Sequence, residues 1–214
     1  MKITWFGQSC FLIEAKDGCK ILTDPFDNSL GYELPSGDVD IVTISHHHRD
    51  HDYVSYIKKS AAIIDSIGDK NIKDIVISGK ESFHDKFNGE KRGKNIIFKF
   101  LIDGFSICHL GDLGHELDSD FINWIGDLDI LMIPVGGNYT IDGTEAASIA
   151  SKINSHLIIP MHFGTAALSF PLEGAEKFIT SMKNGEKLAS SYLEMDSVPE
   201  DRKVVKILRY QNKI

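Results

Sequence analysis

A short run of histidines with an aspartate contains the residue types that bind divalent metal ions. The run reads His46-His47-His48-Arg49-Asp50-His51. Neutral imidazole nitrogens and carboxylate oxygens are the ligands that suit zinc and similar divalent metals. Because residues two apart point the same way at an extended strand end, His46 and His48 can share one ion. Asp50 and His51, where the chain turns, are then expected to serve a second ion beside it.

The run follows an apolar segment over residues 40–45, which is predicted to be a short buried strand. The alternative is a solvated polar loop, or a histidine tract that binds metal adventitiously. Such a tract needs no strand before it and no partners elsewhere. Here the strand is present and single ligand candidates recur downstream, so we favour a metal site. Residues 53–59 are expected to begin a helix whose positive end is directed at the site.

Three further ligand candidates lie where an apolar segment gives way to glycine and polar residues: His84, Asp112 and His162. Functional residues concentrate at such junctions. Asp112 is costly to bury as a bare carboxylate, and a position between two cations would remove that cost. A lone histidine in such a place is more often a satisfied core group. Three candidates together with the first cluster nevertheless favour ligands.

Two residues are expected to support the site without holding an ion. His109 competes with His84 for one ligand position, and spacing alone does not decide between them. Because His109 precedes Asp112 by three residues on the same strand, we expect it on the opposite face, in a supporting or packing position. Asp24, just before Pro25, can accept the N–H of a ligating imidazole, although a turn-forming Asp-Pro pair explains it equally well.

Candidate substrate contacts lie on two loops. Asn138 and Tyr139 follow a buried strand on a glycine-rich loop and can donate hydrogen bonds to a substrate. An ordinary tight loop explains them equally well. Lys91, Arg92 and Lys94 can attract an anionic substrate, although a solvated loop is the plainer interpretation.

Composition limits the class of protein. With 214 residues, 42% of them hydrophobic, the chain can bury one substantial core, and we predict a single domain over residues 1–214. A net charge of −8 without a long basic run argues against a general surface for binding nucleic acids or anionic membranes.

Three cysteines without a disulfide-like or CxxC pattern indicate a reducing compartment. With no signal-peptide or membrane-spanning stretch, we predict a cytoplasmic protein with a small-molecule substrate, and nothing marks an oligomer interface.

Short strands dominate the first part of the chain, whereas helices and strands alternate in the second. Residues 2–6, 10–15 and 19–23 should form an antiparallel meander whose fourth strand, 40–45, carries the metal loop at its end. Further strands are expected at 61–65, 74–78, 95–102, 105–110, 129–135, 156–160 and 203–209, and helices at 118–125, 142–153 and 172–182. This order suggests two sheets with helices on the outer faces.

Taken together, these residues resemble the motifs of the metallo-β-lactamase superfamily. The resemblance is carried by His46-x-His48-x-Asp50-His51, then His84, Gly111-Asp112 and Pro160-Met161-His162. Residues 5–10, Asp24-Pro25 and residues 134–140 are most similar to its small single-domain metal-dependent hydrolases, a branch that includes ascorbate-6-phosphate lactonase-like enzymes. The resemblance implies an α/β (α+β) fold, a four-layer αββα sandwich with the metals at one edge.

By motif position, the resemblance also implies two ion sites that share one ligand. One ion would be held by His46, His48 and His84, the other by Asp50, His51 and His162, with Asp112 bridging them. His47 and Arg49 stand where the family often has smaller residues, which leaves the metal preference open. Ligation by nitrogen and oxygen suits Zn²⁺ first, and Mn²⁺ and Fe²⁺ accept the same ligands.

The predicted function is that of a metal-dependent hydrolase. Hydroxide bound by two divalent ions, roughly 3.5–4 Å apart, would attack an ester, lactone or phosphoester bond of a small anionic substrate. Asp50 is the candidate catalytic residue, which orients the nucleophile or accepts its proton. The scaffold alone does not define the substrate, because function resides in the site.

Rival functions use a similar scaffold. A diiron protein that reduces oxygen or nitric oxide needs an electron partner, and no flavodoxin-like domain fits in 214 residues. An RNA-processing or phosphodiester-cleaving nuclease is disfavoured by the acidic balance and by the lack of an added RNA-binding arm. A non-enzymatic metal-binding regulator would show missing ligands, and none is missing. A β-lactam substrate does not suit a cytoplasmic protein.

Overall fold

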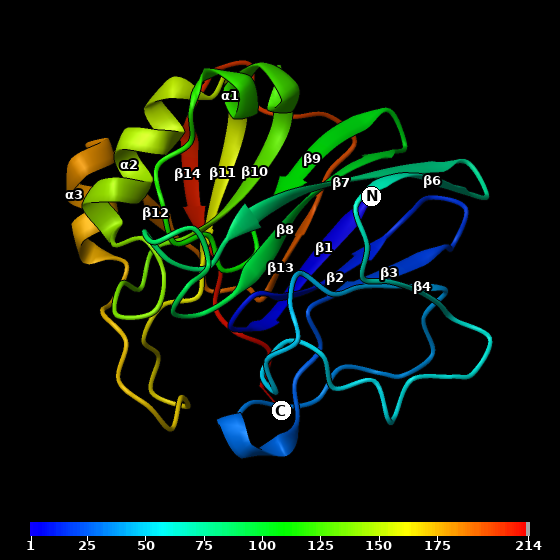
Figure 1. The fold of residues 1–214 in the computed structure, drawn as a ribbon. Coiled ribbons are helices and arrows are strands. Elements are labelled where there is room, and N and C mark those ends of the chain that lie inside the picture. The colour runs from blue at the N-terminus through cyan, green and yellow to red at the C-terminus, as the bar shows by residue number, and fades with distance from the viewer. Residues whose placement is uncertain (213–214) are drawn as a thin grey trace.

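Two β-sheets face each other in the computed structural model, which describes residues 1–212 (Figure 1). The sheet orders are β13-β1-β2-β3-β4-β5 and β12-β14-β11-β10-β9-β8-β7-β6. The six-stranded sheet consists of β1 (Lys2–Gly7), β2 (Cys10–Glu14), β3 (Lys20–Thr23), β4 (Ile41–Thr43), β5 (Ala62–Ile64) and β13 (Tyr192–Glu194). The eight-stranded sheet consists of β6 (Gly68–Ile72), β7 (Ile75–Phe83), β8 (Lys94–Ile102), β9 (Phe105–His109), β10 (Leu128–Pro134), β11 (Ser155–Met161), β12 (Glu186–Lys187) and β14 (Val204–Ile207).

The inner strands of the six-stranded sheet are buried on both faces. On β1, Trp5 belongs to the core between the sheets, whereas Phe6 belongs to a second core on the opposite face. On β4, Ile41 and Val42 divide between the two cores in the same way. Because successive side chains of a strand alternate between faces, continuous apolar strands such as these require cover on both sides.

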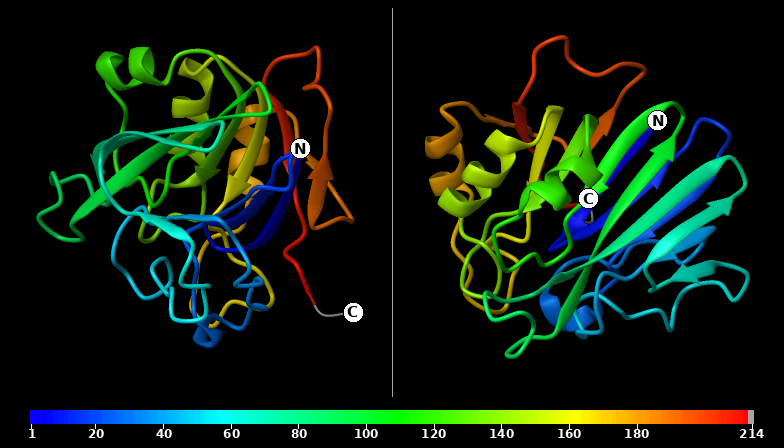
Figure 2. Two further views of the ribbon diagram at one scale, coloured as in Figure 1. Left: turned by 90° about the vertical axis from the view of Figure 1, so that its right-hand side faces the viewer. Right: turned by 45° about the horizontal axis from the view of Figure 1, so that its top comes forward.

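The two outer layers differ in structure. Helices α1 (Ser119–Ile125), α2 (Gly143–Lys152) and α3 (Glu176–Met182) lie together over the eight-stranded sheet (Figures 1 and 2). Loops and the 3-10 turn η1 (Asn28–Leu30) cover the second core instead. The predicted two-sheet sandwich is confirmed, and loops make up most of one outer layer. Among residues 1–212, no helix is long and apolar enough to cross a membrane.

Two predictions around the metal loop were wrong. Residues 53–59 form no helix: the backbone N–H of Tyr53 donates to the Pro25 carbonyl, and that of Lys58 to the Gly37 carbonyl. This segment is therefore tied to the loop over residues 24–40 by long-range hydrogen bonds. Strand β4 pairs with β3 in parallel and does not continue an antiparallel meander. Residues 24–40 are long enough for the crossover that a parallel pair requires.

Other differences concern exposed or irregular segments. Strand β6 was not predicted, because none of its residues is buried and no alternating pattern exists. It forms a hairpin with β7, which extends beyond the predicted 74–78 to Phe83. The short exposed strands β12 and β13 were also missed. Helix α3 begins at Glu176, not at 172, because the N–H of Glu173 donates to the Gly136 carbonyl.

Strand direction brings the site together. Both β1 and β3 pair antiparallel with β2, so they run in the same direction, and β4 is parallel to β3. In the other sheet, β7 and β9 both pair antiparallel with β8, while β9, β10 and β11 are parallel. The carboxyl ends of these strands therefore lie at a shared edge in each sheet, where the following loops can meet.

Candidate metal centre

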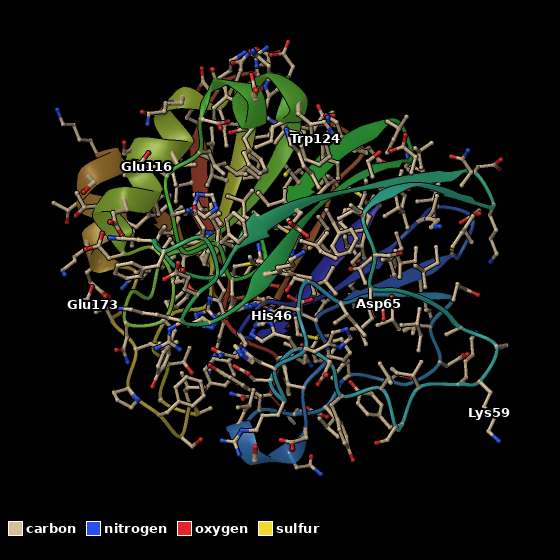
Figure 3. The ribbon with its side chains drawn as sticks, in the orientation of Figure 1. His46, Lys59, Asp65, Glu116, Trp124 and Glu173 are labelled. Carbon is tan, nitrogen blue, oxygen red and sulfur yellow. The ribbon has the colours of Figure 1, made fainter. Side chains whose placement is uncertain are left out.

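All seven predicted ligands come together in the structure. They follow the carboxyl ends of four strands: His46, His48, Asp50 and His51 after β4, His84 after β7, Asp112 after β9 and His162 after β11. Their ligand atoms form three groups, each within 4.8 Å: His46–His48–His84, His46–His51–Asp112 and Asp50–His51–His162. Figure 3 shows His46 near the centre of the view, whereas Lys59 reaches outward at its margin.

Asp112 lies at the middle of the cluster. Its Oδ2 atom is 3.1 Å from His162 Nε2, 3.2 Å from His51 Nε2, 3.5 Å from His84 Nε2 and 3.9 Å from His46 Nε2. Asp112 is only 2% exposed. One carboxylate oxygen thus faces histidines of each group, which is the placement expected of a bridging ligand.

A tight turn fixes the position of Asp112. The backbone N–H of Asp112 donates to Asn95 Oδ1 at 2.9 Å, and Ser9 Oγ donates to Asp112 Oδ1 at 3.2 Å. Gly111 has φ +56°, and a Cβ there would lie 2.3 Å from Asn95 Oδ1. The turn therefore requires glycine directly before the aspartate, in the left-handed region that other residues rarely adopt.

The donor set fits divalent metal ions. His46 Nε2 and His51 Nε2 are buried, and neither has a hydrogen-bond partner among residues 1–212. Their Nδ1 atoms are held, that of His46 by Ser45 Oγ at 3.0 Å and that of His51 by Asp24 Oδ2 at 3.0 Å. Buried polar atoms without partners are costly. A metal ion would satisfy these two nitrogens, and the other ring nitrogen of each histidine is already bonded, as in known metal sites.

Two histidines of the cluster are held in the neutral form, whereas the nearby carboxylates Asp112 and Asp50 raise the pKa of His51. Burial lowers the pKa of His46 well below its ordinary value and lowers the pKa of His84 to about 4, so both rings are neutral at pH 7. The neutral imidazole is the form that binds a metal. Burial alone would raise the pKa of Asp112, but the charges of His162 and His51 hold it well below its usual range. Asp112 is therefore ionised and able to bind cations.

Asp24 connects two of the histidines through one carboxylate. Its Oδ2 atom accepts from His51 Nδ1 and from Ser45 Oγ at 2.6 Å, and its Oδ1 accepts from the Ser45 backbone at 2.7 Å. Ser45 Oγ in turn lies 3.0 Å from His46 Nδ1. Asp24 is fully buried and adopts φ +40°, a left-handed conformation in which non-glycine residues are uncommon. Its position is thus beside the cluster, where it orients ligand candidates.

His109 lies outside all three groups. Its Nε2 donates to the Ser9 carbonyl at 2.8 Å, and the Gly111 backbone N–H donates to its Nδ1 at 3.2 Å. Both ring nitrogens are therefore used within the protein. The structure places His84, and not His109, against Asp112. His47 is exposed and faces Asp52 and Asp65 at 3.3 Å and 3.7 Å.

Sequence reasoning missed Gln8 as a site residue. Its side chain is fully buried, and Gln8 Nε2 lies 3.2 Å from Asp50 Oδ2 and 3.3 Å from His162 Nε2. Gln8 has φ +47°, and its carbonyl accepts from the His162 backbone N–H at 3.0 Å. His162 itself has φ +50°. Gln8 lies in the short loop between β1 and β2, and this position was the available signal, because loops at strand ends often carry functional residues.

A cavity of about 250 Å³ opens beside the cluster. It is lined by His48, Arg49, Asp50, His84, Arg92, Asp112, Tyr139, His162 and Phe170. Of the two predicted substrate contacts, Tyr139 lies on this wall. Asn138 does not; it lines a neighbouring cavity of about 440 Å³, and its amide donates to the Pro171 carbonyl at 3.3 Å. Arg49 and Phe170 were not predicted as lining residues.

Comparison with known proteins agrees with this geometry. The family model described as "Beta-lactamase superfamily domain" matches residues 2–162. A UPF0173 protein of Pyrococcus furiosus is 30% identical over 190 aligned positions, covering 81% of this chain and 88% of that protein. A UPF0173 metal-dependent hydrolase of Listeria monocytogenes is 30% identical and covers 86% of this chain and 94% of that protein.

Solved structures show the same relationship. A Thermotoga maritima protein of the metallo-beta-lactamase superfamily superimposes with a TM-score of 0.81 at 40% identity. The match covers 97% of this chain and 98% of that one. The family predicted from the histidine and aspartate motifs is confirmed. The chain belongs to the metallo-β-lactamase superfamily, within its UPF0173 group of metal-dependent hydrolases.

Proposed function

We propose that the chain hydrolyses an ester, lactone or phosphoester bond in a small anionic molecule, with two divalent ions as cofactors. The observation that carries this proposal is the position of Asp112 Oδ2, between 3.1 and 3.9 Å from four histidine nitrogens that belong to different ligand groups. A structural site for one ion needs four ligands and no open cavity. Seven candidates beside a cavity support a catalytic pair.

Each ion has its own ligands in this proposal. One would be held by His46, His48 and His84, the other by Asp50, His51 and His162, and Asp112 would be shared by both. When bound, such ions lower the pKa of water toward neutrality and polarise a carbonyl or phosphoryl oxygen. Zn²⁺ is the first choice for this set of nitrogen and oxygen ligands, ahead of Mn²⁺ and Fe²⁺.

Asp50 is proposed as the catalytic residue that orients water and accepts its proton. It lines the cavity, and its Oδ2 accepts a hydrogen bond from Gln8 Nε2 at 3.2 Å. Burial acts against its ionised form, but the charge of His51, whose Nε2 is 3.4 Å away, lowers the pKa of Asp50 well below its ordinary value. Asp50 is therefore an anion at neutral pH, as a proton acceptor must be.

Tyr139 is proposed to contact the substrate, since it lines the cavity, and Asn138 to shape the loop beside it. The lining also favours a small molecule over a nucleic acid. Ligand pockets for drug-sized molecules typically measure about 300–1,000 Å³. The cavity of about 250 Å³ fits the compact part of a substrate that lies at the metal cluster, and it shares Arg92 and Tyr139 with the neighbouring cavity of about 440 Å³.

Metal content per chain tests the proposal. Elemental analysis of protein purified without chelator should give about two ions in the parent and about one in His162→Ala, because that change removes one ligand of a single site. The matched control is His47→Ala, an exposed histidine of the same run, which should keep both ions. In parallel, His48→Ala should abolish ester hydrolysis with the fold retained. Parent protein that binds no metal after supplementation, or His48→Ala with full turnover, would refute the proposal.

A further inference from the structure

Arg92 borders the cavity beside the metal cluster and has no acidic partner. Within residues 1–212, no carboxylate oxygen lies within 4.0 Å of its guanidinium nitrogens. Two nearby lysines are paired with carboxylates: Lys94 Nζ is 2.8 Å from Glu81, and Lys86 is paired with Glu145. The exposed Lys91 instead lies over the Phe87 ring. Arg92 is half-buried as a residue, and its guanidinium therefore stands at the cavity wall without an acidic counterpart among residues 1–212.

The guanidinium lies against an aromatic ring that is itself packed. Its central carbon lies 4.5 Å from the ring centroid of Tyr139, a distance at which cation–π attraction operates. The Tyr139 ring packs against Phe170, with centroids 5.9 Å apart. These contacts fix the planar group at the cavity wall before any ligand arrives, and less side-chain entropy is then lost on binding.

Asp85 fixes the backbone that carries Arg92. Its two carboxylate oxygens accept four backbone N–H groups, those of Phe87 and Gly89 at Oδ1 and those of Lys91 and Arg92 at Oδ2. The four distances lie between 2.7 and 3.0 Å. Asp85 is thus a positioning residue that orders residues 85–92, directly after the ligand candidate His84.

The charges of the cavity wall define what it can accept. Its carboxylates, Asp50 and Asp112, are both assigned to metal ions in the proposed function, which leaves the guanidinium groups of Arg49 and Arg92. A guanidinium matches the two oxygens of a carboxylate or phosphate with parallel N–H bonds. Tyr139 and Phe170 provide an aromatic surface beside it for an apolar or planar substrate body.

We propose that Arg92 selects the substrate by binding an oxyanion, a carboxylate or phosphate group attached to a compact planar or apolar body, while the bond to be cleaved lies at the metal cluster. The cleavage step in this inference rests on the proposed hydrolase function, whereas the binding of an oxyanion by Arg92 does not. Arg92 acts as the specificity residue, and Tyr139 supports its guanidinium.

Calorimetry on the metal-loaded protein tests the binding. The probes are phenylphosphonate and benzoate, which distinguish phosphate-like from carboxylate groups, and benzyl alcohol as the neutral counterpart. Arg92→Gln should weaken binding of at least one anion about tenfold or more, the usual effect of losing a charge-assisted hydrogen-bonded pair. Lys94→Gln, which removes a paired cation two residues away, should change the affinity less than twofold. Equal anion affinity in the parent and Arg92→Gln, or equal losses in both variants, would overturn the proposal.

Kinetics with paired substrates provides the second readout. The mono-4-nitrophenyl ester of glutaric acid is anionic, and 4-nitrophenyl pentanoate is a neutral ester of similar length. Arg92→Gln should raise KM for the anionic ester about tenfold, with kcat and all constants for the neutral ester nearly unchanged. Equal changes for both esters would overturn the role in specificity. If the parent cleaves neither ester while calorimetry shows Arg92-dependent anion binding, the ester-hydrolase proposal fails and the anion site stands.

Discussion

Asp24 is the residue through which the cluster is tied to the six-stranded sheet. It follows β3 directly and contacts Ser45 and His51, which follow β4. By accepting the His51 Nδ1–H, it makes Nε2, which faces Asp112 and Asp50, the ring nitrogen that is available to a metal ion. A partner of this kind sets both the tautomer and the orientation of a ligating imidazole.

Asp24→Asn should therefore weaken metal binding without removing a ligand. The amide has one oxygen where the carboxylate has two, so its NH2 group must face one of the donors of Ser45 or His51. Changes of this kind typically cost about 10- to 100-fold in metal affinity. Competition with a chromophoric chelator measures the affinity, and circular dichroism monitors the fold. Asp38→Asn, an exposed carboxylate paired with Lys58, is the control and should bind metal as the parent does. Unchanged affinity in Asp24→Asn would contradict the assigned role.

The ligands could be predicted from sequence because metal chemistry restricts them to histidine and carboxylate side chains at strand ends. Gln8 and Ser9 could not, since amides and hydroxyls occur throughout any chain and only the fold brings these two to Asp50 and Asp112. Arg92 was noted as a loop cation, but its missing acidic partner and its contact with Tyr139 are visible only in three dimensions.

At the level of elements, predictions succeeded where the signal is local. Helix α2 was predicted from the spacing of Asp142 and Glu145, and the structure contains the complete capping box. The helix prediction for residues 53–59 failed for the opposite reason. Their backbone donors pair with Pro25 and Gly37, far away in sequence, and no local pattern records such long-range partners.

Removing the cap of α2 should destabilise the protein measurably. Asp142 Oδ1 accepts the N–H groups of Thr144 and Glu145, each at 2.9 Å. Asp142→Ala leaves these donors without a side-chain acceptor and should lower the free energy of unfolding by about 1 kcal/mol, within a range of roughly 0.5–2 kcal/mol. Urea titration followed by circular dichroism measures the change. Asp142→Ser retains an acceptor and should recover most of the loss; equal stability of the parent and the alanine variant would contradict the prediction.

At the scale of the whole molecule, the cluster joins the two sheets. His46 and His51 come from the six-stranded sheet, whereas His84, Asp112 and His162 come from the eight-stranded sheet. The order of strands and helices allowed the sandwich to be predicted. The parallel pairing of β3 and β4, which helps aim Asp24 and His46 at the same place, could not be, because strand direction depends on the path of residues 24–40.

Because the ligands span both sheets, metal ions should stabilise the assembled sandwich. A ligand that binds only the folded state adds about 2.7 kcal/mol when present at 100 times its Kd. For a chain of this length, that corresponds to a rise in Tm of about 5 to 10 °C. Adding chelator to the metal-loaded protein should lower Tm by this amount in a calorimetric scan, and added Zn²⁺ should restore it.

Two histidine variants distinguish stabilisation by ions bound at this cluster from a general effect of the chelator on the protein. His46→Ala removes a nitrogen that lies within two of the three ligand groups, so its Tm should respond much less to chelator and Zn²⁺. His47→Ala, exposed and one residue away, should respond as fully as the parent does. The same chelator response in both variants would show that the ions do not bind across the sheets at this cluster. A response confined to proteins with His46 would place the stabilising ions between the two sheets, where hydrolysis is proposed to occur.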